Sequence, residues 1–375
     1  MGILAGKNER GCMEMESDSL YQLEKEITVR IIQEDMESIY SLMCTEKDPI
    51  FSMAILPYYA LFVQACQEYM GEEYLPNVEA KRVKDIRNYI KSYGEQFGKT
   101  KRKIQDIAKI QDRQFRDRLN LDIMKQMNNY VNIGTYWLED KIIVGSTQMY
   151  ADFLEIENVF DPQCAKLQLE LGYQLGRFVA GVKKGFENCI YQPVVKRREE
   201  SIKIGYYADL NINIENHFFA ENSIKEVNLF FLHLLCNMNF VKHILRKLFG
   251  DGNKWVFRVE YIVVYYTYRA LRRLKNYCEN NDDIKLNLEM LNEIFDKGDV
   301  IFQSNFRNCM MHYGLENRNV LSYEYIEKEF FGIVETCFEG QDYQTYIISL
   351  RELSDMIIVF LENRFDITKI EIRPL

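Results

Sequence analysis

The chain has 375 residues, and 47% of them are hydrophobic, while only 19 are Gly and 6 are Pro. This length suggests two domains, because single domains usually hold roughly 100 to 200 residues. The net charge of -9 excludes a protein that holds nucleic acid by overall positive charge, although a local basic face could do so. The nine cysteines are scattered and form no C-x-x-C pair, so we expect reduced thiols and neither a disulfide framework nor a zinc site.

The chain carries no clear targeting or membrane signal. Its first residues, MGILAGKNERGC, lack the apolar core of a signal peptide. No apolar run approaches the roughly 20 residues of a membrane span. We therefore expect a cytoplasmic protein with no membrane partner.

The first half of the sequence has the periodicity of helices. From residue 19 to about residue 187, apolar residues recur at steps of three and four. The prolines of this half are expected at helix starts or kinks, at Pro49, Pro57, Pro76 and Pro162. The pattern predicts a helical N-terminal domain over residues 1–190, whose role the sequence does not define.

Lys and Arg are dense over residues 81–118, but Asp and Glu are interleaved with them. This mixture is typical of a solvated helix surface with ion pairs. A surface that faces nucleic acid is the alternative.

The pattern changes over residues 191–221, where we expect a linker or a short β-hairpin between two domains. Hydrophobic residues alternate there, at Ile202, Ile204, Leu210, Ile212 and Ile214. The C-terminal tail also alternates and could add a strand to this hairpin.

The last part, residues 222–375, has the most regular pattern. Apolar residues at steps of three and four predict helices over residues 223–249, 254–278, 285–295, 300–313 and 343–364. The fold class is therefore mainly α, with two helical domains of which the second is a helical bundle.

One short motif could carry chemistry. The usual signatures of nucleotide-binding proteins, hydrolases and zinc proteases are absent from the sequence. The segment FRNCMMHYG places Arg307, Asn308 and His312 together, and it resembles the R-x(4-6)-H motif of the HEPN superfamily of helical-bundle ribonucleases. The resemblance covers roughly residues 222–365, so it implies a HEPN-like bundle at the C-terminal end.

The chemistry of these residue types suits RNA cleavage without a metal or a cofactor. A histidine transfers protons near neutral pH, and an arginine binds phosphate and the charge that develops on it. His312 is expected in the last turn of its helix, where the helix dipole favours the protonated ring. Residues five apart on a helix point about 140° apart, so Arg307 and His312 do not share a face. The resemblance implies a homodimer in which two such helices meet, with Asn308 orienting a catalytic group.

A basic stripe on the 254–278 helix is the candidate RNA-binding surface. It consists of Arg258, Arg269, Arg272 and Arg273. A solvated or ion-paired helix face is the alternative interpretation. Glu260 could supply an additional polar residue to the site.

The sequence therefore predicts a HEPN-like RNA endonuclease with Arg307, Asn308 and His312 as catalytic residues. The resemblance implies a role in antiviral defence or as a toxin, with RNA and possible regulatory proteins as partners. A non-catalytic helical interaction or scaffold protein is the alternative, in which Arg307 and His312 are structural.

Overall fold

The structure is a computed structural model, and it confirms the mainly helical fold. It describes residues 5–71, 78–118, 130–154, 161–199, 201–213, 218–219, 224–279, 281, 284, 286–316 and 318–375. Among these residues no helix is both long enough and apolar enough to cross a lipid bilayer.

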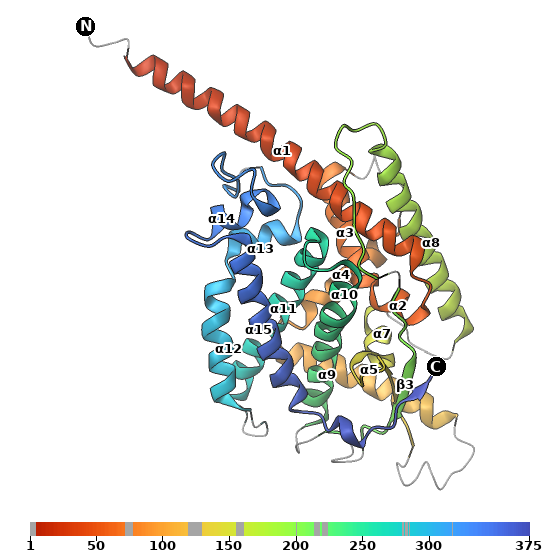
Figure 1. The fold of residues 1–375 in the computed structure, drawn as a ribbon. Helices are drawn as coiled ribbons and strands as arrows, with labels where there is room; N and C mark the ends of the chain where they lie inside the picture. The colour runs from red at the N-terminus through yellow and green to blue at the C-terminus, as the bar shows by residue number, and fades with distance from the viewer. Residues whose placement is uncertain are drawn as a thin grey trace.

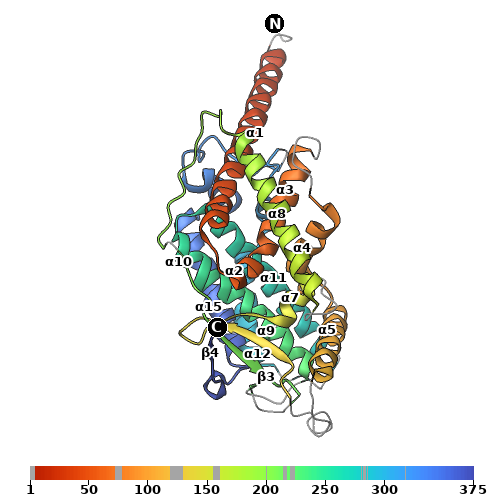
Figure 2. The ribbon, with the colours of Figure 1, turned by 90° about the vertical axis from the view of Figure 1, so that its right-hand side faces the viewer.

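The N-terminal half contributes seven described helices: α1 (Ala5–Thr45), α2 (Pro49–Ala54), α3 (Leu56–Met70), α4 (Ala80–Ser92), α5 (Phe97–Asp117), α7 (Thr147–Phe153) and α8 (Pro162–Gly185). Helix α1 extends well beyond the body of the molecule, and the N-terminus lies at its far tip (Figures 1 and 2).

Proline and aspartate set the helix starts in this half. Pro49 and Pro162 are the first residues of α2 and α8, and the preceding Asp48 and Asp161 accept hydrogen bonds from free backbone N–H groups. Pro57 lies in the first turn of α3. These three positions confirm the sequence prediction, whereas Pro76 lies outside the described residues.

The C-terminal part is helical as predicted, but one helix continues from Leu288 to Ile301 through the break expected between residues 295 and 300, and Ile333–Cys337 forms a short helix that was not predicted. Its main helices are α9 (Lys225–Phe240), the π-helical turn η2 (Val241–Leu245), α10 (Arg246–Phe249), α11 (Lys254–Cys278), α12 (Leu288–Ile301), α13 (Ser304–Met311), α14 (Ile333–Cys337) and α15 (Tyr343–Glu362). Helices α12, α13 and α14 lie on the side of α11 opposite to α8 (Figure 1). A short 3-10 turn, η3 (Glu329–Gly332), directly precedes α14, and a second, η4 (Ile367–Lys369), follows α15.

A small antiparallel sheet joins the two parts of the chain. Its order is β2 (Ile143–Ser146), β1 (Ile133–Trp137), β3 (Tyr206–Leu210) and β4 (Arg373–Pro374). Residues 201–213 thus contribute one strand, and the hairpin lies between β1 and β2 in the N-terminal half. The C-terminal tail does pair with this segment, as Tyr206 opposite Pro374 shows.

The two predicted domains share one hydrophobic core. The buried apolar side chains form one continuous cluster from Ile27 on α1 to Ile370 near the C-terminus. Within it Phe97 of α5 packs edge to face on Phe230 of α9, with ring centroids 5.1 Å apart. The segment 191–221 therefore does not separate two independent cores, and side chains of the first half reach the surface of α11 and α13.

Candidate functional site

Helix α13 carries the sequence motif and presents it at the edge of the core. Phe306 and Met310 are fully buried and anchor the helix, whereas Arg307 and Asn308 are half-buried on its other side. The helix ends one residue before His312, whose backbone is extended, with φ −135° and ψ 150°. Its N–H still donates to the carbonyl of Asn308 at 3.0 Å.

This early end changes the geometry expected for the pair. Because His312 lies outside the helix, its direction is not set by the 140° rotation that five helical residues would give. Its ring instead reaches α3, where Nδ1 lies 3.0 Å from Oε2 of Glu68. No hydrogen bond or ion pair among the described residues joins Arg307 directly to His312.

The environment of His312 favours the neutral ring. Burial is the largest effect and lowers its pKa, although the Glu68 carboxylate opposes this and Arg87 adds to it. The sequence predicted that His312 would lie in the last turn of its helix, where the dipole favours the protonated ring. The residue instead follows the end of α13, and its burial lowers its pKa.

The contact with Glu68 also fixes which ring nitrogen is free. Burial alone would raise the pKa of Glu68, but hydrogen bonds from His312 and Gln64 lower it, so the carboxylate is ionised and can only accept. The proton of the neutral imidazole must therefore sit on Nδ1, as in other carboxylate–histidine pairs. Nε2 is then left as a hydrogen-bond and proton acceptor.

Arg307 lies beside the aromatic face of α11. Its guanidinium carbon is 6.0 Å from the ring centroid of Tyr265, and its positive charge counteracts the burial that raises the pKa of Tyr266. The Nε atom of Arg307 is buried and has no hydrogen-bond partner among the described residues. An arginine without a carboxylate partner keeps its donors available for a phosphate.

Two cations of α4, Arg87 and Lys91, lie near Arg307, although the sequence pattern did not single them out. Burial, followed by the charge of Arg87, lowers the pKa of Lys91 to about 8, and Arg307 adds to this effect. Neither α4 side chain has a hydrogen bond or ion pair within the described part of the chain, and Nε of Arg87 is buried without a partner. The charges of Arg87 and Arg307 both lower the pKa of Lys91 and the Glu68 carboxylate opposes them, so the three cations lie close together beside this carboxylate.

Arg269 is the member of the predicted stripe that lies next to this group. It is half-buried, its guanidinium carbon is 5.7 Å from the ring centroid of Tyr265, and a Cβ at Gly94, just after α4, would lie 3.6 Å from its Cβ. We name Arg87, Lys91, Arg269, Arg307 and His312 the basic cluster. It combines residues of α4 and α11 with α13 and the residue that follows it.

The other residues of the predicted stripe lie elsewhere. Arg258 is wrong as an RNA contact, because it is buried in an ion pair with Asp35 of α1 and donates to the carbonyl of Met310 at 3.0 Å. Arg272 is exposed and pairs with Asp299, and Arg273 is exposed.

Glu260 does not contribute to the basic cluster either. It is buried on α11, where its two carboxylate oxygens lie 3.5 Å from Arg246 and 3.4 Å from Arg351. A buried carboxylate between two guanidinium groups is a structural arrangement.

The missed residues had a weak signal in the sequence. Arg87 and Lys91 are four apart, so they share one face of the α4 helix, but the neighbouring Asp and Glu residues hid this face in the overall charge pattern. Glu68 had no signal, since only the packing of α3 against the segment after α13 brings it to His312. Tyr69 of the same helix confirms that packing by donating to Glu316 at 2.9 Å.

No metal-binding group of three or more His, Cys, Asp or Glu side chains is present among the described residues. Comparison of the chain with protein families, with curated proteins and with solved structures finds no match.

Proposed function

We propose that the chain is a metal-independent RNA endonuclease of the HEPN type. The observation that carries the proposal is the basic cluster. Its arginines and lysine form no ion pair with a carboxylate among the described residues, although Glu68 lies near them, and they adjoin a neutral histidine whose Nε2 can accept a proton. Such a group matches the needs of RNA cleavage, which are cations for a phosphate and a base near neutral pH.

The proposed reaction is an intramolecular transesterification. Nε2 of His312 takes the proton of the ribose 2′-OH, and the 2′-oxygen forms a bond to phosphorus while the bond from phosphorus to the 5′-oxygen breaks. Arg307 and Arg87 stabilise the charge on the non-bridging oxygens. Lys91, with a pKa of about 8, is a suitable donor of the proton that the leaving 5′-oxygen takes up. The products are a 2′,3′-cyclic phosphate and a 5′-hydroxyl.

The remaining parts of the proposal come from the resemblance of the motif. They are a homodimer, a role of Asn308 in orienting a catalytic group, a regulatory protein partner, a cytoplasmic location, and a role in antiviral defence or as a toxin. With Arg87 and Lys91 of α4, one copy of the chain already contributes several positive charges to the proposed site. Size-exclusion chromatography with light scattering measures whether two copies associate.

The test is cleavage of a mixed RNA pool by the purified full chain, with and without EDTA. We expect cleavage in both conditions, and a loss of about 100-fold or more in His312→Ala and in Arg307→Ala, as is usual for a missing catalytic group. His243→Ala is a matched control, since that histidine lies on η2, away from the cluster. Cleavage that survives His312→Ala, or that EDTA abolishes, would contradict the proposal.

A non-catalytic interaction protein is the second candidate, and one observation favours it. Helix α8 exposes three large apolar side chains, Leu167, Leu169 and Tyr173, and the exposed fraction of Leu169 is 75%. If the chain is a non-catalytic interaction protein, the RNA pool stays intact. His312→Ala then lowers the melting temperature, because the contact to Glu68 is structural. A catalytic role predicts little change in melting temperature.

A further inference from the structure

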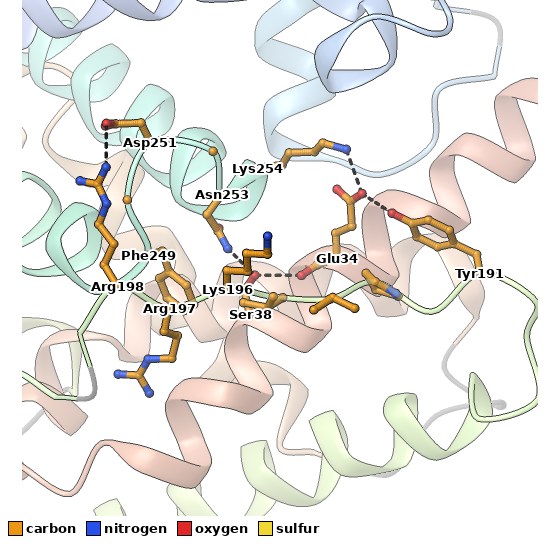
Figure 3. A pocket seen from close by; sticks show the side chains of 15 residues that line it. Glu34, Ser38, Tyr191, Lys196, Arg197, Arg198, Phe249, Asp251, Asn253 and Lys254 are labelled. Atoms are coloured by element: carbon orange, nitrogen blue, oxygen red, sulfur yellow. Dashed lines mark hydrogen bonds and ion pairs between the residues drawn. The ribbon is translucent and has the colours of Figure 1, made fainter.

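A second candidate site lies about the start of α11, far along the chain from the α13 motif. An open cavity of about 660 Å³ is lined by α1, by the extended segment 191–198 and by the loop between α10 and α11 (Figure 3). This volume lies within the roughly 300 to 1,000 Å³ that is usual for small-molecule sites. The proposed ribonuclease does not use any residue of its lining.

One part of the cavity is basic. Lys196 and Arg198 are exposed on the extended segment and Lys254 begins α11, whereas Arg197 turns away toward Glu46 of α1 (Figure 3). Lys196 has no hydrogen bond or ion pair in the described part of the chain. Among the described residues the side chain of Arg198 makes one long ion pair, with Asp251 at 3.8 Å, so both side chains keep donors for an anion.

Two glycines let other groups lie close to the backbone of the loop before α11. Gly250 has φ +75°, and a Cβ there would lie 2.7 Å from Nε of Arg198, so glycine is required for this guanidinium to lie over the loop. At Gly252 a Cβ would meet nothing within 4 Å, so the chain is open to the cavity there. The first turn of the 25-residue helix α11 follows, and its positive dipole end adds to the basic charge.

The other part of the cavity has an unused acceptor. Oε1 of Glu34 accepts hydrogen bonds from Lys254 at 2.9 Å and from Tyr191, as Figure 3 shows. Its second oxygen, Oε2, is buried and has no hydrogen-bond partner in the described part of the chain. A buried carboxylate oxygen without a donor is unfavourable, and a ligand hydroxyl would satisfy it.

The wall along the extended segment is apolar, with Pro193, Val194 and Val195 in the lining. A ligand that fits must therefore carry an anionic group, at least one hydroxyl and a flat or apolar part. A nucleotide has all three, as phosphate, ribose and base.

We propose that this cavity binds a nucleoside diphosphate. The phosphates contact Lys196, Arg198 and the start of α11, and a ribose hydroxyl donates to Oε2 of Glu34. This inference does not rest on the ribonuclease proposal, because the two sites share no residue.

Isothermal titration calorimetry of the full chain with ADP, GDP, CDP and UDP tests the proposal. At least one of them should bind, and both adenosine and inorganic pyrophosphate should bind more weakly than ADP if ADP is the one bound. Lys196→Ala with Arg198→Ala should weaken binding at least about tenfold, since charge-assisted hydrogen bonds to phosphate are lost. Lys247→Ala is the matched control, because Lys247 is exposed on α10 outside the cavity lining.

Glu34→Gln separates the two ends of the ligand. It should weaken binding of the nucleotide and leave binding of pyrophosphate unchanged, and circular dichroism shows whether each variant is folded. The proposal is overturned if no nucleoside diphosphate binds at about 1 mM. It is equally overturned if the double variant binds as tightly as the unchanged chain, or if an RNA oligonucleotide binds here and no nucleotide does.

Discussion

Replacing Arg258 by methionine tests the assignment of this residue to the core. Its side chain is 6% exposed and that of its partner Asp35 only 1%, and Tyr313 also donates to Asp35 at 2.8 Å. Arg258→Met keeps most of the volume but leaves the carboxyl group buried without its cation. Burial already raises the pKa of Asp35 to about 6 despite the arginine, so the loss raises it further and the group is neutral at pH 7.

The expected loss in the free energy of unfolding is about 3 to 5 kcal/mol, the usual result of removing one partner of a buried ion pair. This is a large share of the roughly 5 to 15 kcal/mol that holds a typical domain folded. Urea unfolding followed by circular dichroism at pH 7 measures it. The double variant Asp35→Leu with Arg258→Met should recover most of the loss, because an apolar pair has no unpaired charge.

The result that would refute this reasoning is specific. If Arg258→Met lowers the free energy of unfolding by less than about 1 kcal/mol and also weakens RNA binding, the arginine acts at the surface and the buried pair is not formed. Arg273→Met is a matched control, because that arginine is exposed on the same helix.

Three further predictions concern histidine protonation, helical glycines and the basic cluster. Burial lowers the pKa of His233 to about 3, so the free energy of unfolding should be unaffected above pH 6.5 and should fall by about 2 kcal/mol between pH 6.5 and 5. Urea titrations of His233→Gln should lack this part of the pH dependence. Gly298→Ala should destabilise by about 1 to 3 kcal/mol, since its Cβ would lie 2.2 Å from the ring of Tyr268, whereas Gly176→Ala meets nothing within 4 Å and should stabilise by about 0.5 to 1 kcal/mol. Thermal melts that give both alanines the same sign would contradict the close packing of Tyr268 on Gly298. Glu68→Gln should reduce RNA cleavage about tenfold or more without loss of folding, and unchanged cleavage would exclude it as the partner that orients the histidine.

Much of the helical framework could be predicted from local sequence. The expected helix over residues 254–278 is α11, because its apolar spacing encodes one buried face and Asn253 caps its first turn by accepting from Val256 N–H at 2.9 Å. Asp48 and Pro49 set the start of α2 in the same local way. Helix caps and apolar periodicity depend on residues a few positions apart, so they can be recognised in the sequence without knowledge of the tertiary structure.

The sheet depended on contacts that local patterns do not encode. Alternation marked residues 202–214 as extended, but the partner of β3 is β1, about 70 residues earlier in the chain. A strand's pattern shows which face is buried and not which strand lies beside it.

The candidate site was decided mainly by tertiary structure. The motif itself predicted Arg307 and His312, but the end of α13 at Met311 and the approach of Glu68 set the direction and protonation of the histidine. Arg258 belonged to a basic stripe by spacing, and α1, more than 200 residues away in sequence, covers it with Asp35. The charge pattern of the sequence shows which residues share a helix face. Whether a cation on that face is free to bind a phosphate depends on its burial and on the nearest opposite charge, and elements distant in the chain determine both.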